Sequence, residues 1–232
     1  MDAAVVSRRF SARMARADAV CVVSPHLRDM LIRRGIRSTV VPAGCFPDET
    51  THPEPADLGD VAGPRAVFIG MVSDRIELAL LAALIDAGIS IVVVGPVQNT
   101  FSKQREFKEL LLRRDFHHLS PRTGSDLHAL LQHCDVGLIP YTQSEFNDSS
   151  FPLKAFEYLA AGLQIVSTPL PAMSWLGHGV IHIESDPSAY VSAAVSACHS
   201  KSARADECRS IAADNSWDTR AAVFAELLGL SK

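Results

Sequence analysis

Short apolar runs alternate with amphipathic segments along most of this chain of 232 residues. Runs of three to five mostly apolar residues predict buried strands, and apolar positions that repeat every three or four residues predict helices. Strands of this kind, joined by crossover helices, are typical of a parallel sheet covered on both faces. The pattern therefore predicts an α/β fold, a Rossmann-like parallel sheet flanked by helices. We expect strands at 66–69, 90–94, 116–119, 136–139, 165–167 and 180–183, and helices at 76–87, 103–113, 126–133, 153–161, 188–199 and 203–213.

Further signals lie near the two ends of the chain. Ser24 and Pro25 suit the N-cap and the first position of a helix at 26–34, which lies between two short β-type runs. Ser216 suits the N-cap of a last helix. Residues 46–64 lose all periodicity and are rich in proline and glycine, which is typical of a linker. We therefore divide the chain into an N-terminal segment (1–45), a linker (46–64), a main domain (65–215) and a C-terminal helix (216–232).

Composition narrows the class of protein. Hydrophobic residues make up 47% of the chain and charged residues 21%, which is ordinary for a globular protein with a real core. The net charge of −4 argues against a nucleic-acid-binding protein, which normally carries a basic excess. The five cysteines are scattered and predict neither a disulfide framework nor a zinc site. No apolar run reaches the roughly 20 residues that span a bilayer. We expect a soluble, cytoplasmic protein.

The stretch from residue 147 to residue 169 concentrates groups that suit a phosphorylated ligand. Ser149 and Ser150 offer hydroxyl groups and the chance of an N-cap just before a predicted helix. Lys154 lies in the first turn, where a cation opposes the helix macrodipole unless an anion is bound at the free N–H groups. Glu157 follows three residues later on roughly the same face. An exposed Lys–Glu pair on an amphipathic helix is the alternative, and spacing alone does not choose between the two.

The order of residue types in this stretch is more specific than the spacing of Lys154 and Glu157. The residues Pro-Leu-Lys-x-Phe-Glu-Tyr-Leu-Ala-Ala-Gly at 152–162, followed by an apolar strand and Ser-Thr-Pro, resemble the donor-site helix of GT-B fold glycosyltransferases. The resemblance is to bacterial members with a PLKxxEYLAAGxPVV-type signature, in which this helix belongs to the C-terminal domain. It implies that Glu157 binds the ribose hydroxyls of a nucleotide sugar and Lys154 its diphosphate. Many retaining members carry a second glutamate eight positions earlier, where this chain has Ser149. Glu145 is out of register, so the stereochemical outcome stays open.

Two loops at predicted strand ends are further candidates for donor contacts, because parallel sheets bind ligands beyond the carboxyl ends of their strands. In the loop 70–75, Gly70 permits a close backbone approach and Arg75 can bind a phosphate through two N–H groups. An ordinary helix N-cap at Ser73 or Asp74 is the alternative there. The polar loop 141–147 offers stacking and hydrogen bonds to a sugar or base, although most exposed polar loops bind nothing. Its candidate residues are Tyr141, Glu145 and Asn147.

Other classes of site are not supported. The spacing of the nine histidines does not match a metal site, so we predict no metal. The chain has no G-x-S-x-G, G-x-G-x-x-G or P-loop sequence, which argues against a hydrolase, a dinucleotide oxidoreductase and an NTPase. We expect no cofactor and a metal-independent reaction, consistent with the lack of Asp-x-Asp. Arg8, Arg9, Arg13 and Arg16 suit peripheral contact with an anionic membrane, but a solvated helix face explains them equally.

The resemblance also implies an organisation. The segment 17–44 looks like the last strand–helix–strand of an N-terminal acceptor domain, and the Ser-Trp-containing C-terminal helix like one that braces that domain. We therefore expect the donor-binding half of a hexosyltransferase, with residues 1–45 as a remnant of the other half. Transfer to an unknown acceptor would then need a partner that supplies the missing domain. A non-catalytic nucleotide-sugar-binding module is the main alternative, and a sugar-nucleotide epimerase is another. Apolar surface left by a lost domain predicts dimerisation or poor solubility.

Overall fold

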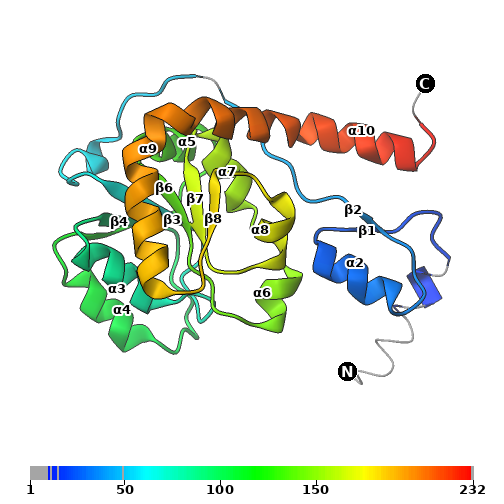
Figure 1. Cartoon of the computed structure of the whole chain (residues 1–232), viewed down its shortest axis with the longest axis horizontal. Coiled ribbons are helices and arrows are strands. Elements are labelled where there is room, and N and C mark those ends of the chain that lie inside the picture. The colour runs from blue at the N-terminus through cyan, green and yellow to red at the C-terminus, as the bar shows by residue number, and fades with distance from the viewer. Residues whose placement is uncertain (1–9, 11, 15, 49, 231–232) are drawn as a thin grey trace.

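A twisted parallel sheet of six strands forms the centre of the protein (Figure 1). The computed structural model describes residues 10–230 except 11, 15 and 49. The strand order is β5-β4-β3-β6-β7-β8, and every neighbouring pair is parallel. This arrangement confirms the predicted α/β class. The strands are β3 (Arg65–Ile69), β4 (Ser90–Val94), β5 (Phe116–Leu119), β6 (Val136–Ile139), β7 (Gln164–Ser167) and β8 (Ile181–Ile183).

Helices cover the sheet and bury its central strands. All five residues of β4 are buried, as expected for a strand that has helices on both faces. The long helix α9 packs against α3, α7 and β7 and crosses the sheet (Figure 1). The buried apolar side chains therefore form one continuous core between the sheet and the helices. The helices of the main domain are α3 (Leu78–Asp86), α4 (Gln104–Leu111), α5 (Gly124–Gln132), α6 (Glu145–Ser149), α7 (Lys154–Ala160), α8 (Pro171–Leu176) and α9 (Pro187–Asp214).

The prediction of two helices at 188–199 and 203–213 was wrong. The structure has one helix, α9, which continues through residues 200–202. No glycine or proline interrupts this stretch, so nothing ends the helix there. Ser200 Oγ donates to Ser196 O, one turn earlier, and Lys201 Nζ donates to Gln132 O at 2.8 Å. These polar side chains are therefore satisfied within a continuous helix.

Several local predictions near the sheet also need correction. The stretch 141–147 is not an open loop, because residues from Glu145 form α6 with Ser144 as its N-cap. Neither Ser73 nor Asp74 caps the helix that follows, since α3 begins only at Leu78. The Asp74 carboxylate instead accepts a hydrogen bond from the backbone N–H of Ser102 at 3.0 Å. The short helix α8 was not predicted. These errors all concern segments that tertiary contacts organise.

The N-terminal segment forms a small unit of its own. Strands β1 (Cys21–Val22) and β2 (Thr39–Val40) are parallel and are joined by α2 (Pro25–Ile32), which packs against α6 and α8. Ser24 caps α2 and Pro25 opens it, as predicted. The chain then passes through residues 41–64, which include a single 3₁₀ turn, η1 (Ala56–Leu58), before it enters β3. Of the four arginines considered for membrane contact, Arg8 and Arg9 lie outside the described residues.

The last helix returns towards this N-terminal unit. Helix α10 (Trp217–Leu227) has Ser216 as its N-cap, as predicted, and lies beside β1 and β2 (Figure 1). Its first residue is fixed to the end of the N-terminal segment, because the backbone N–H of Trp217 donates to Cys45 O at 3.0 Å. A Cβ atom on Gly44 would lie 2.7 Å from Trp217 N, so only glycine permits this crossing.

Candidate functional site

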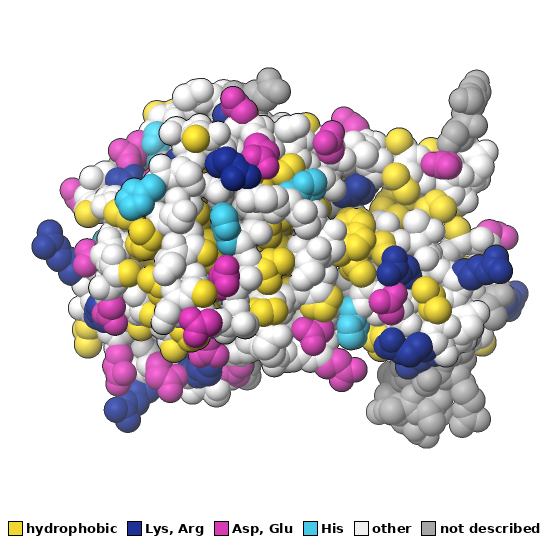
Figure 2. Space-filling view, in the orientation of Figure 1, with side chains coloured by type: hydrophobic (Ala, Val, Ile, Leu, Met, Phe, Trp, Pro, Cys, Tyr) yellow, Lys and Arg dark blue, Asp and Glu magenta, His cyan; other side chains and the backbone are white. Residues whose placement is uncertain are grey.

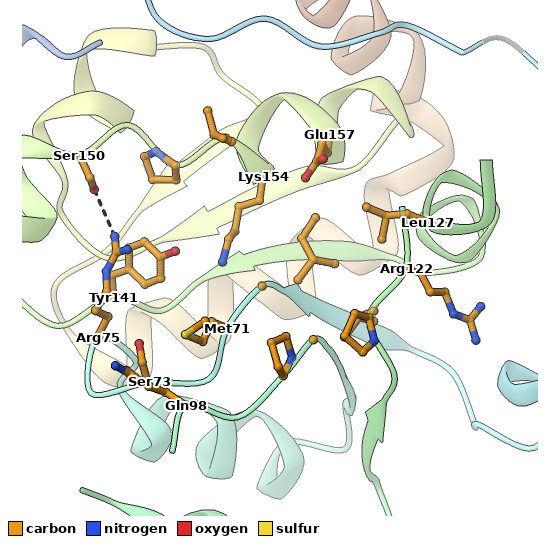
Figure 3. Close-up of a pocket in the computed structure, with 18 of the residues that line it drawn as sticks. Met71, Ser73, Arg75, Gln98, Arg122, Leu127, Tyr141, Ser150, Lys154 and Glu157 are labelled. Atoms are coloured by element: carbon orange, nitrogen blue, oxygen red, sulfur yellow. Dashed lines mark hydrogen bonds between the residues drawn. The ribbon is translucent and has the colours of Figure 1, made fainter. Parts of the chain in front are cut away.

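A cavity of about 610 Å³ opens at the carboxyl ends of the strands, beside the first turn of α7. The sheet reverses its winding direction between β3 and β6, and parallel α/β sheets bind ligands outside such a switch point. Loops that follow β3, β4, β5 and β6 contribute to the walls. Figure 3 shows Arg75 and Ser150 on one side of this cavity, Lys154 reaching into its middle, and Glu157 with Leu127 and Arg122 on the other side.

Lys154 lies at the floor of the cavity. Its side chain is buried, and Nζ lies 3.7 Å from the centre of the Phe68 ring and 4.9 Å from that of Tyr141. It forms no ion pair with any described residue. Burial lowers its pKa well below the usual range, and the nearby Arg75 lowers that pKa further. A buried ammonium group on aromatic faces thus meets this cavity without a bonded counter-ion.

The strand-end glycines make room for this lysine. Gly70, directly after β3, has φ +117°, a conformation that only glycine adopts readily. A Cβ atom there would lie 3.3 Å from Lys154 Nζ. At the neighbouring strand end, a Cβ on Gly95 would lie 2.3 Å from Gly70 O. The two backbones therefore approach each other closely and leave the lysine open to the cavity.

Arg75 provides the second cation. Its guanidinium carbon lies 4.6 Å from the centre of the Tyr141 ring and 4.7 Å from that of Phe146. Nε donates to Asn147 Oδ1 at 2.6 Å, and Nη2 donates to Ser150 Oγ at 3.3 Å. Among the described residues, none accepts a hydrogen bond from Nη1. The guanidinium is therefore clamped on two faces and one edge, while its Nη1 edge is free to bind a ligand.

Glu157 lies one turn after Lys154 and is exposed at the edge of the cavity. Although part of the side chain is exposed, its carboxyl group is partly desolvated by the surrounding protein, and this raises its pKa. The positive charge of Lys154 opposes that rise. A second cavity, of about 550 Å³, also borders Glu157 and is lined by Phe46 and Trp217 among others. The carboxylate thus separates two hollows and can accept hydrogen bonds from hydroxyl groups on either side.

The structure brings six of the nine candidate residues together around the first cavity and leaves three outside it. Asn147 is fully buried behind Arg75. Ser149 lies in the same turn, but its backbone carbonyl accepts a hydrogen bond from Ser24. Glu145 is exposed on α6. The six residues that line the cavity are Gly70, Arg75, Tyr141, Ser150, Lys154 and Glu157.

Sequence reasoning missed several residues of this cavity. Phe68 belongs to a buried strand, and no sequence signal indicates that its ring lies beneath a lysine. Phe146 stands inside the stretch considered for donor contacts, and its aromatic character is a signal that could have been weighed. It is 67% exposed although it packs on Arg75, so one face of the ring is open to solvent. Met71 is another exposed apolar residue of the lining.

No three His, Cys, Asp or Glu side chains in the described part of the chain are grouped so that they could hold a metal ion. No helix among the described residues combines the length and apolar character needed to cross a membrane.

Residues 63–200 match the model of the family "Glycosyl transferases group 1". TuaH of Bacillus subtilis (strain 168), named for a glycosyltransferase role in teichuronic acid biosynthesis, is 33% identical over 109 residues, which are 46% of this chain and 27% of TuaH. The residues matched by the family model, 63–200, include all those that line the first cavity.

Solved structures share the fold at low sequence identity. Anabaena HepE (Alr3699), crystallised with UDP, superposes with a TM-score of 0.76 at 18% identity, over 92% of this chain and 64% of HepE. Sucrose-phosphate synthase from Thermosynechococcus elongatus gives a TM-score of 0.74 at 17% identity, over 96% of this chain and 61% of the synthase. The chain thus spans less than two thirds of each of these relatives.

Proposed function

Because the chain belongs to the group 1 glycosyl transferases, we propose that it binds a nucleoside diphosphate sugar and serves transfer of a hexosyl group to an acceptor. Its main domain would be the donor-binding half of the enzyme. The observation that carries this proposal is the pair of cations, Arg75 and Lys154, that face one cavity without an ion pair to a described residue. A diphosphate would supply the missing negative charge.

The order of groups along the cavity matches the parts of a nucleotide sugar. Arg75 and Lys154 would bind the diphosphate, and Glu157 would accept hydrogen bonds from the ribose hydroxyls. HepE has been crystallised with UDP-glucose, which supports a uridine nucleotide as the first ligand to test. The titration described below is designed to identify the base and the sugar that this chain binds.

The proposed chemistry is stabilisation of the leaving group. As the bond between the sugar carbon and the diphosphate breaks, negative charge accumulates on the departing phosphate oxygen. Nη1 of Arg75 and the ammonium of Lys154 would stabilise that charge. This route needs no metal ion, because the two cations perform the same electrostatic task.

We propose that the acceptor binds to a further domain, in the same polypeptide or in a partner. Exposed apolar residues on α10 and on the N-terminal unit support this, as does the greater length of the relatives. The site of action would be the cytoplasm, and exposed arginines of the N-terminal unit would allow contact with an anionic membrane surface. A non-catalytic nucleotide-sugar-binding module is the second candidate, because the cation pair needs no acceptor to act.

Isothermal titration with UDP, GDP and their sugars tests this proposal. We expect micromolar binding of one nucleotide and an affinity loss of at least about tenfold in Glu157→Ala, which equals roughly 1.4 kcal/mol. Glu145→Ala is the matched control, since this glutamate lies outside the cavity, and it should bind like the wild type. Equal losses in both variants, or no binding by a folded wild-type chain, would overturn the proposal. Transfer to an added acceptor would then separate the enzyme from the binding module.

A further inference from the structure

We propose that the N-terminal segment positions the diphosphate-binding arginine, through a chain of hydrogen bonds that runs from Ser24 to Arg75. Ser24, Ser150 and Asn147 are positioning residues in this scheme and do not themselves need to touch the ligand. The inference rests on the proposed function for its ligand, but the arrangement of side chains that supports it is independent of any ligand.

The first link joins two parts of the chain that are 125 residues apart in sequence. Ser24 Oγ donates to the backbone carbonyl of Ser149 at 2.7 Å, and it also accepts from Leu27 N at 3.3 Å as the N-cap of α2. Ser24 is completely buried, so water does not compete for this hydrogen bond. The end of α6 is therefore held by the N-terminal unit.

The second link runs from this turn to the guanidinium group. Ser150 directly follows Ser149, and its Oγ donates to Asn147 O at 2.8 Å while it accepts from Arg75 Nη2 at 3.3 Å. Ser149, which accepts from Ser24, and Ser150, which accepts from Arg75, are thus consecutive residues. A shift of the Ser149 carbonyl would move the hydroxyl that holds Arg75.

Asn147 completes the arrangement at the Nε end of the same edge of the guanidinium. Its Oδ1 accepts from Arg75 Nε at 2.6 Å, and its Nδ2 donates to Thr142 O at 2.7 Å. The backbone N–H of Thr142 in turn donates to Arg75 O at 2.8 Å. Because both ends of the buried amide are engaged, Asn147 fixes the plane of the guanidinium and not merely its distance.

This plane matters for anion binding. Arginine binds a phosphate best when two N–H groups point at it together, so its affinity depends on orientation more than that of a lysine does. The rings of Tyr141 and Phe146 hold the faces, and Asn147 with Ser150 holds one edge. The Nη1 edge is thereby presented to the cavity before a ligand arrives. Loss of the hydrogen bond from Ser24 would therefore make the orientation of the Arg75 guanidinium less fixed, although Ser24 itself lies outside the cavity.

The test compares Ser24→Ala with Ser216→Ala in the full chain. Each variant removes a serine N-cap hydroxyl, from α2 and α10 respectively, but only Ser24 contacts the turn before Ser150. By titration we expect UDP affinity to fall about three- to tenfold in Ser24→Ala and to stay unchanged in Ser216→Ala. Ser150→Ala, which leaves both caps intact, should show a similar fall. In an Arg75→Ala background, Ser24→Ala should have no further effect.

A second measurement needs no ligand. The Nε–H proton of Arg75, assigned in an NMR spectrum by its absence in Arg75→Ala, should exchange slowly with water in the wild type and in Ser216→Ala. We expect faster exchange in Ser24→Ala. If the wild type binds no nucleotide while this difference is found, the proposed function fails and the positioning role stands. Equal exchange in Ser24→Ala and the wild type, or affinity losses for Ser24→Ala and Arg75→Ala that multiply, would overturn the positioning role.

Discussion

At the residue scale, Lys154 shows how the proposed diphosphate site would be held ready at the expense of stability. The ammonium is buried on the rings of Phe68 and Tyr141, and burial, with Arg75 close by, lowers its pKa. A group whose pKa is lower in the folded than in the unfolded protein binds its proton less tightly when folded. Between the two pKa values the unfolded state holds more protons, so this lysine makes stability rise with pH across that window.

Replacing Lys154 by methionine should therefore have opposite effects on stability and binding. We expect Lys154→Met to raise the melting temperature at neutral pH by about 2–4 °C, the shift that a gain of about 1 kcal/mol gives in a chain of this size. UDP binding should weaken by about ten- to a hundredfold, since a charge-assisted hydrogen bond contributes roughly 1.5–3 kcal/mol. Calorimetry measures both. Lys103→Met, which removes a lysine near Glu77 at the surface, should do neither. A lower melting temperature for Lys154→Met would contradict this account.

The same lysine predicts a pH dependence. As pH is raised from neutral towards 10, the melting temperature of the wild type should fall less, or rise more, than that of Lys154→Met, because only the wild type loses an unfavourable buried charge. The difference between the two curves is the measured quantity, so other groups that titrate in this range cancel. Parallel curves would mean that Lys154 has the same pKa in the folded and the unfolded protein, which would contradict this account.

At the element scale, the cavity depends on how closely two neighbouring strand ends approach. Gly70 follows β3 and Gly95 follows β4, and both have φ angles in the range that glycine alone adopts readily. A side chain at either position would separate the loops or displace Lys154. The parallel register of the two strands brings these glycines together, since Ile69 is paired with Val94.

Substitution of Gly95 should destabilise the protein by more than the cost of placing a side chain at a positive φ angle, because the new Cβ would also clash with Gly70 O. Gly95→Ala places a Cβ 2.3 Å from Gly70 O, whereas Gly88→Ala, also at positive φ, meets no atom within 4 Å. The backbone penalty of roughly 1–2 kcal/mol is shared. We expect Gly95→Ala to lose at least about 1 kcal/mol more than Gly88→Ala in chemical denaturation, and to bind nucleotide more weakly. Equal losses would show that the strand ends can separate freely.

At the scale of the whole molecule, the N-terminal unit and α10 present apolar surface that the chain does not cover. On α10 and directly after it, Phe224 is 40% exposed and Leu228 63%. Figure 2 shows apolar side chains gathered between α10 and the N-terminal unit. Contiguous apolar surface of this kind usually marks a contact with another protein or domain.

The chain in isolation should therefore self-associate. Light scattering across a concentration series should show an average mass that rises above the 25.1 kDa of one chain. The double substitution Phe224→Ser and Leu228→Ser should return the mass towards a monomer, because it removes two of the exposed apolar side chains on and next to α10. Leu112→Ser provides the control, since that leucine is 88% exposed on the opposite part of the molecule. A monomer at all concentrations in the unaltered chain would count against this interface.

The sequence by itself determined the α/β class, the six strands and the place of the signature helix, because short apolar runs and their spacing are local properties of the chain. It also singled out Lys154 as a cation in the first turn of a helix, Glu157 through the resemblance, and Arg75 by its place in a strand-end loop. It did not indicate α6, a polar turn of helix that is stabilised by Asn147 and by contacts with α2.

Only the tertiary structure decided what these residues do for one another. Asn147, expected in the sequence to face a ligand, lies behind Arg75 and fixes its orientation. Lys154, expected in the first turn of a helix, is buried over the ring of Phe68, which stands far earlier in the chain. The physical reason is that burial and hydrogen-bond geometry depend on neighbours brought together through the sheet, and no local pattern in a single sequence records which neighbours those are.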